Sequence, residues 1–170
     1  MTENQAKQLI DIVKYLYDCR ILHRDIRPEN LMIDHKMHIK LIDFGFATPY
    51  DPRKNLHVAG GIWYAGIKFL AYYNSYLSWV NPTVKYEYER TFDIQCAINV
   101  IMSLKKADIK SEMDIIKSIE SISGKIIKLF QIWINVKEKY PIYANLLRFI
   151  NGFNKGPEFD LMKDQIRKLF

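Results

Sequence analysis

The residues of this sequence that are best suited to chemistry lie in two short segments near its beginning. The first, residues 23–30, reads HRDIRPEN, and the second, residues 42–45, reads IDFG. Asp25, Asn30 and Asp43 carry carboxylate or amide oxygens, which are the ligands that hard divalent cations prefer. The two segments therefore offer candidate ligands for a divalent cation, provided that the fold brings them together.

The chain between these two segments is typical of a β-hairpin. Residues 31–33 and 39–42 are apolar and rich in β-branched side chains, and a polar turn separates them. In such a hairpin Asn30 precedes the first strand and Asp43 follows the returning strand, so the two residues meet at its open end. The hairpin is thus the element that must position the candidate ligands.

Helical patterns account for most of the remaining chain. Residues 3–19 show apolar side chains at the spacing of one helix face, behind a Thr-x-x-Gln capping box. Residues 92–104 are apolar nearly all round, which predicts a helix buried at the centre of the core. Glycine and proline separate four further predicted helices, at residues 113–122, 124–137, 142–150 and 159–170. With an extended segment at residues 43–66, the sequence predicts a mainly α fold with a short β-hairpin.

Composition indicates one globular domain over residues 1–170. The chain is 49% hydrophobic and 26% charged, and its 25 Lys and Arg are dispersed among 19 Asp and Glu, which argues against a nucleic-acid partner. The most apolar windows are too short to span a bilayer, so no membrane partner is expected. Cys19 and Cys96 suggest no disulfide framework and are expected to be buried thiols. We expect a soluble, cytoplasmic protein, with the nucleus also compatible.

HRDIRPEN and IDFG resemble the catalytic loop and the magnesium-binding Asp-Phe-Gly of eukaryotic-type protein kinases. They occur in the same order, with the same hairpin between them. The resemblance is specific over residues 6–104 and architectural beyond them, and Pro28-Glu29 is typical of the Ser/Thr type. It implies a protein-kinase-like C-lobe, with a catalytic loop at residues 21–30 and a magnesium-binding and activation segment at residues 43–68.

The resemblance also implies roles for individual residues. Asp25 would orient the acceptor hydroxyl and take its proton, while Arg27, which stands where Ser/Thr kinases usually carry lysine, would reach the γ-phosphate. Asn30 and Asp43 would hold Mg²⁺ against the phosphates of ATP. Arg24 would meet a phosphorylated activation loop.

Supporting roles follow from the same comparison. Leu31 or Met32 would form the floor of the adenine pocket. His23 and Phe44 would stack on each other, and Asp93 would hold the backbone of the catalytic loop through its amide groups. A helix N-cap is the alternative interpretation of Asp93.

The sequence also departs from the family. Gly45 is the first glycine and only 24 residues precede Asp25, so we expect this chain to lack the β-rich N-lobe with its Gly-rich phosphate loop and ATP-anchoring lysine. Gly61 replaces a threonine, Ile98 replaces a glycine, and Lys68 replaces the glutamate that normally pairs with a late arginine. The usual anchoring ion pair of the activation segment therefore cannot form.

Three functions remain open. The first is ATP-dependent phosphoryl transfer to a protein hydroxyl of the Ser/Thr type, with the N-lobe supplied by a longer product or a partner chain and the isolated chain weak or inactive. The second is a truncated pseudokinase that serves as an interaction module. The third is a small-molecule phosphotransferase of kinase-like fold, which Arg24 and Phe44-Gly45 fit less well. Because the missing lobe would leave apolar surface open, we also expect self-association or a required partner.

Overall fold

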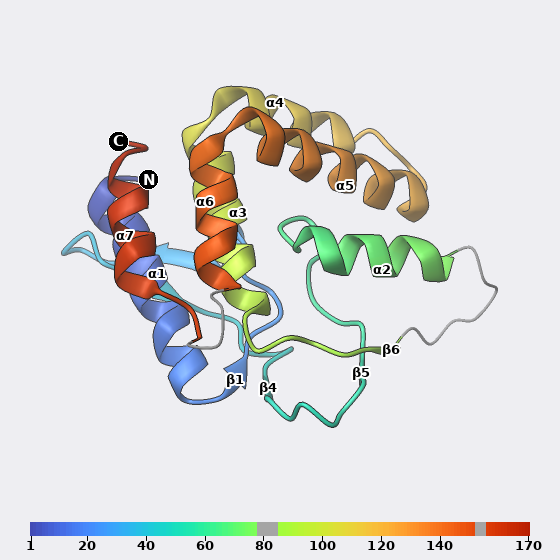
Figure 1. Cartoon of the computed structure of the whole chain (residues 1–170), viewed down its shortest axis with the longest axis horizontal. Helices are drawn as coiled ribbons and strands as arrows, with labels where there is room; N and C mark the ends of the chain where they lie inside the picture. The colour runs from blue at the N-terminus through green and yellow to red at the C-terminus, as the bar shows by residue number, and fades with distance from the viewer. Residues whose placement is uncertain (78–84, 152–155) are drawn as a thin grey trace.

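The computed structural model describes residues 1–77, 85–151 and 156–170 (Figure 1). Within these ranges the helices are α1 Glu3–Asp18, α2 Ile67–Leu77, α3 Phe92–Lys105, α4 Ala107–Ile116, α5 Ile122–Lys139, α6 Pro141–Ile150 and α7 Phe159–Arg167. The strands are β1 Ile21–Leu22, β2 Leu31–Ile33, β3 Ile39–Leu41, β4 Thr48–Pro49, β5 Leu56–His57 and β6 Lys85–Tyr86, and a single 3₁₀ turn spans Pro28–Asn30. The mainly helical fold with few, short strands is confirmed.

Helix α1 begins at the capping box that the sequence predicts. The backbone N–H of Gln5 donates to the Thr2 hydroxyl at 3.2 Å, and the N–H of Thr2 donates to the Gln5 side chain at 2.9 Å. The apolar face of α1, which includes Leu9 and Val13, is buried against α3 and α7. Figure 1 shows α1 and α7 side by side, with both ends of the chain nearby.

Helix α3 forms the centre of the core. Eleven of its 14 residues are buried, and it packs against α1, α4 and α6. Trp133 of α5 and Tyr143 of α6 stack at 5.8 Å in the same core. The prediction of a central helix buried on every side is confirmed, because a helix that is apolar all round is stable only when other elements surround it.

The predicted hairpin is formed by β2 and β3, which pair antiparallel with Leu31 opposite Leu41 and Ile33 opposite Ile39. Asp34 closes its turn, since its Oδ1 accepts the backbone N–H groups of residues 36 and 38, each at 2.9 Å. The other strands form two more antiparallel pairs, β1 with β4 and β5 with β6. Both of these pairs join residues 43–68, the predicted activation segment, to distant parts of the chain.

Three sequence predictions are corrected. The helix predicted at residues 113–122 is Ala107–Ile116, because Ile109, Met113 and Ile116 form its buried stripe. The next helix begins at Ile122, since the Ser121 hydroxyl accepts the N–H of Gly124 at 3.1 Å and caps it. Cys19 is exposed rather than buried, because α1 ends before it.

None of the helices in the described ranges combines the length and the apolarity needed to cross a membrane. The sequence predicts that the Tyr and Trp side chains from Trp63 to Trp79 serve in packing, and Trp79 lies outside the described residues.

Candidate active site

The carboxylate of Asp25 is buried and held from two sides. The side-chain amide of Asn30 donates to Asp25 Oδ2 at 2.8 Å and to the Asp25 carbonyl at 2.9 Å. The Nε of Arg27 lies 3.1 Å from the same Oδ2, as an ion pair without hydrogen-bond geometry. Three of the predicted site residues are therefore brought together within one loop.

The other carboxylate oxygen of Asp25 has a different environment. Asp25 Oδ1 is buried and receives no hydrogen bond from the described residues. It lies against Gly61, where an added Cβ would approach it to 2.5 Å. Since a buried unsatisfied carboxylate oxygen is costly, this atom is an acceptor that lacks its donor.

Asp93 holds the backbone of residues 21–30, the predicted catalytic loop. Its two carboxylate oxygens accept the N–H groups of His23 at 2.6 Å and Arg24 at 2.9 Å. Arg24 has a left-handed backbone (φ 66°), which is unfavourable for a non-glycine residue, so these two bonds help to hold it there. Burial raises the pKa of Asp93 to about 6, although the two donated hydrogen bonds oppose the rise.

Asp93 is not the N-cap of α3, because Thr91 occupies that position. The structure thus places Asp93 in the contact that the kinase resemblance implied, and the N-cap interpretation is wrong.

His23 links the catalytic loop to the Asp-Phe-Gly segment. Its Nε2 lies 3.1 Å from the carbonyl oxygen of Ile42, and its Nδ1 lies 3.3 Å from the N–H of Asp25. A neutral ring with its proton on Nε2 satisfies both contacts, and burial lowers the pKa of His23 accordingly. The ring also meets Phe44 at 4.7 Å, so the predicted pair is in contact, but edge-on rather than stacked.

The hairpin brings the backbones of the two candidate magnesium ligands together. The N–H of Ile42, the residue before Asp43, donates to the Asn30 carbonyl at 3.0 Å. Because the Asn30 side-chain nitrogen is engaged by Asp25, its amide oxygen is left as the candidate ligand atom. Asp43 is exposed and adopts φ 60°, with Oδ1 accepting the N–H of Gly45 at 3.2 Å.

This donor set suits magnesium held jointly with phosphates. Magnesium prefers oxygen ligands and is usually bound through one or two carboxylates together with substrate phosphates. The described residues contain no cluster of three His, Cys, Asp or Glu that would form a metal site by themselves. Asn30 and Asp43 therefore fit a shared site rather than a closed protein cage.

Met32 lies on β2 with a side chain that is 55% exposed, whereas its neighbour Leu31 is half-buried against the core. Further exposed apolar residues lie on the same hairpin and in the segment after it. We define the hairpin face as Met32, Ile33, Met37, Ile42, Phe44 and Phe46, whose exposed fractions run from 37% to 59%. The predicted adenine floor is thus one of six exposed apolar side chains on the hairpin and the segment after it.

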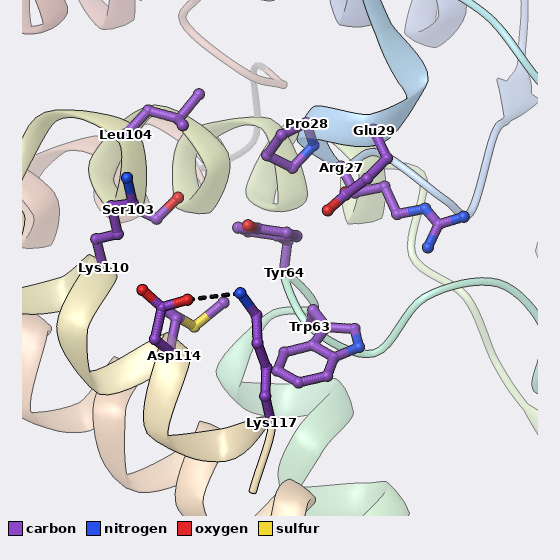
Figure 2. A pocket seen from close by; sticks show the side chains of 11 residues that line it. Arg27, Pro28, Glu29, Trp63, Tyr64, Ser103, Leu104, Lys110, Asp114 and Lys117 are labelled. Atoms are coloured by element: carbon purple, nitrogen blue, oxygen red, sulfur yellow. Dashed lines mark hydrogen bonds and ion pairs between the residues drawn. The ribbon is translucent and has the colours of Figure 1, made fainter.

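A pocket of about 380 Å³ adjoins the catalytic loop (Figure 2). Arg27 and Glu29 line it from the loop, and Tyr64 lines it from the end of the activation segment. Asp114 and Lys117, paired at 2.6 Å, close the side formed by α4 and the residue after it. The sequence pattern did not predict this pocket, because the residues of its wall come from four separate parts of the chain.

The end of the activation segment is anchored by buried polar contacts. The side-chain amide of Asn99 donates to the carbonyl oxygens of Tyr64 at 2.9 Å and Ala65 at 3.2 Å. The hydroxyl of the fully buried Tyr143 donates to Asn99 Oδ1 at 2.7 Å. Asn99 and Tyr143 were not predicted as anchors, since a polar residue inside an apolar helix gives no sign of its partner.

Lys68 replaces the glutamate that pairs with a late arginine in the family, and it forms a different ion pair. It forms an ion pair with Glu89, which precedes α3 in the chain. The Lys68 side chain is 77% exposed, so this pair contributes little to stability. Ile98, the other departure in this region, is fully buried in α3.

Residues 1–81 of the chain match the family model of the protein kinase domain. The chain is 50% identical over 50 residues to the serine/threonine-protein kinase PKH2 of Saccharomyces cerevisiae. This match covers 29% of this chain and 5% of that protein. It is 52% identical over 44 residues to the serine/threonine-protein kinase chk-1 of Caenorhabditis briggsae, covering 26% of this chain and 9% of that protein.

A longer match joins it to a probable casein kinase I homolog of Encephalitozoon cuniculi, 25% identical over 155 residues, covering 74% of this chain and 45% of that protein. The chain thus spans less than half the length of these curated relatives. The matches support the protein kinase superfamily.

Proposed function

We propose that this chain forms the C-terminal lobe of a Ser/Thr-type protein kinase, which transfers the γ-phosphoryl group of ATP to a protein hydroxyl. One observation carries the proposal: Asp25 is fixed through Oδ2 by Asn30 and Arg27, while its buried Oδ1 lacks a donor. An acceptor hydroxyl is the donor that this oxygen needs. The Ser/Thr kinases among the relatives support the same conclusion.

In this mechanism each residue of the site has a defined task. Asp25 accepts the hydrogen bond of the hydroxyl, orients its oxygen and takes its proton as the new O–P bond forms and the bond from the γ-phosphorus to the departing ADP breaks. Arg27, whose Nε already lies 3.1 Å from Asp25, directs its remaining guanidinium N–H groups to the transferred phosphoryl group. Asn30 and Asp43 hold Mg²⁺, which neutralises charge on the phosphates when it is bound.

The upper half of the ATP cleft would come from an N-lobe that lies outside these 170 residues, on the same polypeptide or on another. The hairpin face supports this arrangement, because its apolar side chains lie beside the catalytic loop and remain open to water. Met32 would then meet the adenine ring. The isolated chain is expected to bind ATP weakly and to be inactive.

A pseudokinase that acts as an interaction module is the second candidate, and one observation favours it. Gly61 lies against Asp25 Oδ1 and leaves that oxygen inaccessible, so a hydroxyl reaches it only if the Gly60–Gly61 backbone moves. Gly60 already adopts φ 82°, and two consecutive glycines permit such a movement. The two candidates therefore differ in whether this turn opens.

The test combines the chain with a kinase N-lobe added as a separate polypeptide. Transfer of labelled γ-phosphate from Mg²⁺-ATP to a mixed Ser/Thr protein substrate is measured for the native chain, Asp25→Asn and Asp43→Asn. The kinase proposal predicts transfer only with the N-lobe present, reduced by about 100-fold or more in Asp25→Asn. Nucleotide binding without transfer would favour the pseudokinase, and transfer that Asp25→Asn leaves unchanged would contradict the assigned roles.

A further inference from the structure

The guanidinium group of Arg24 is already engaged by the chain itself. Its Nε donates to the Phe46 carbonyl at 2.7 Å, and its Nη1 lies 3.3 Å from the His57 carbonyl. The group also lies over the ring of Tyr88, 5.5 Å from the ring centre. Arg24 thus joins the start and the middle of the activation segment without any phosphate group.

A second set of contacts holds the middle of the segment in place. Strand β5 pairs with β6, with Leu56 opposite Tyr86 and His57 opposite Lys85. Two residues further along, the N–H of Ala59 donates to the Tyr88 hydroxyl at 3.3 Å, and this hydroxyl lies 3.4 Å from the Ala59 carbonyl. The backbone of residues 56–59 is therefore bonded to residues that lie just before α3.

Tyr88 is itself rigidly supported. It is 3% exposed and meets Phe92 at 4.9 Å, Tyr86 at 5.1 Å and Phe69 at 5.9 Å between ring centres. Such aromatic contacts add to the stabilisation from burial alone. Tyr88 therefore connects the core, through α2 and α3, to both Arg24 and Ala59.

Gly60 completes the contact between the segment and the catalytic loop. At φ 82°, a Cβ on this residue would lie 2.1 Å from the Arg24 carbonyl oxygen, so the two backbones touch. Because Arg24 directly precedes Asp25, the position of residues 56–60 is coupled to that of the proposed catalytic carboxylate.

The sequence of the segment also indicates that its order does not depend on phosphorylation. From Asp51 to Trp63 it reads DPRKNLHVAGGIW, which contains no Ser, Thr or Tyr. The nearest hydroxyls along the sequence are those of Thr48, Tyr50 and Tyr64, which lie outside this stretch. Phosphorylation thus has no acceptor within the stretch that pairs with β6.

We propose that Tyr88 is a positioning residue that, together with β6 and Arg24, orders residues 56–61 against the catalytic loop without phosphorylation. An aromatic ring and backbone carbonyls take the place that the kinase resemblance gave to a phosphorylated side chain. This inference rests on the proposed function. Its test measures conformation rather than phosphate transfer, so the inference and the proposed function can fail independently.

The test is amide hydrogen exchange on phosphatase-treated full chain, read on peptides that contain residues 56–61. The native chain is expected to protect these amides. Tyr88→Ala should reduce the protection at least 10-fold there, while peptides from α3 and α6 keep theirs. Tyr88→Phe keeps the ring contacts with Arg24 and the core, so it should lose protection at Ala59, whose N–H donates to the Tyr88 hydroxyl, and retain it at the other amides. Tyr76→Ala is the matched control, because the recorded ring contact of Tyr76 is with Tyr72 on the same helix.

Three results would overturn the proposal: free exchange of residues 56–61 in the native chain, unchanged protection in Tyr88→Ala, or protection that phosphatase treatment removes. If Tyr88→Ala fails to fold, judged by lost protection in α3, Arg24→Ala provides the second variant. It leaves the aromatic cluster intact, and it should still release residues 56–61 at least 10-fold. Unchanged protection in Arg24→Ala would contradict the role of the guanidinium group.

Discussion

Asp25 and Gly61 are the two residues whose contact decides whether this site can work. The orphaned Oδ1 of Asp25 and the missing side chain at position 61 are complementary, since any Cβ there would meet that oxygen at 2.5 Å. The glycine that departs from the family pattern is therefore required by the geometry around Asp25. A bulkier residue would have to displace a carboxylate that Asn30 and Arg27 hold in place.

Gly61→Ala is expected to lower the free energy of unfolding by about 1–3 kcal/mol, because the added methyl group overpacks a buried contact. Chemical denaturation measures this change. The control is a double-mutant cycle, in which the same substitution in an Asp25→Ala background should cost clearly less, since the clashing oxygen is gone. Equal costs in both backgrounds would show that the methyl group does not meet Asp25.

The raised pKa of Asp93 predicts how the free energy of unfolding depends on pH. Its folded pKa of about 6 lies above the ordinary 3.8, so the folded state keeps a proton that the unfolded state releases. The stability from this group is fully present below about pH 4 and is lost as pH rises through about 6. Relative to Asp93→Asn, the native chain should lose about 3 kcal/mol of unfolding free energy between pH 4 and pH 7. A difference between the two chains that stays constant over this range would contradict the raised pKa.

At the scale of elements, Asn99 and Tyr143 join α3, α6 and the end of the activation segment. This buried chain of hydrogen bonds does the anchoring for which Lys68 is unsuited. It also explains why a polar residue is retained in the otherwise apolar α3: its amide satisfies two backbone carbonyls that would otherwise be buried alone.

Tyr143→Phe should cost about 1–3 kcal/mol of unfolding free energy, because it leaves Asn99 Oδ1 buried without a donor. The matched control is Tyr140→Phe, which removes a hydroxyl that donates to Asp108 at 2.7 Å in an exposed position. Its cost should be below about 0.5 kcal/mol. Thermal or denaturant unfolding of both variants provides the comparison, and similar costs for the two would rule out the buried anchor.

The elements that the sequence predicts well are those defined by local patterns. The capping box of α1, the apolar run of α3 and the β2–β3 hairpin each depend on neighbouring residues, and each is present. The helix at 107–116 was misplaced because its apolar stripe is sparse and no strong cap marks its start. The β5–β6 pairing had no local signal, since its two-residue strands meet across a long separation in sequence.

The same distinction holds within the site. The residue types at positions 25, 30 and 43 and the hairpin between them could be read from the motifs. The ion pair of Arg27, the orphaned oxygen and the contact with Gly61 could not, because they depend on how the loop and the activation segment pack together.

At the scale of the whole molecule, the hairpin face is the feature that most needs a partner. Six apolar side chains with exposed fractions of 37% to 59% gather on the hairpin and the segment after it. We therefore expect this exposed apolar surface to take part in an interaction or to favour association. Met32, the proposed adenine floor, lies within it.

Light scattering of the purified chain is expected to show self-association that increases with concentration. Replacing Met32 and Ile33 with lysine should shift the chain toward a monomer, because charge on this face opposes its burial. The matched control replaces Ile115 of α4 and Ile127 of α5, both 54% exposed, in the same way and should leave the association unchanged. A native chain that is monomeric at every concentration would count against the open face.

The central claim is that Asn30 and Asp43 hold a divalent cation beside Asp25, and Mn²⁺ tests it directly as a paramagnetic substitute for Mg²⁺. In NMR spectra of the full chain with excess ATP, millimolar Mn²⁺ should selectively broaden the Asn30 side-chain amide and the backbone amides of residues 43–45. The Asp43→Asn variant should lose this selectivity while the rest of its spectrum is unchanged. Broadening that spares these signals, or that persists unaltered in Asp43→Asn, would contradict the account.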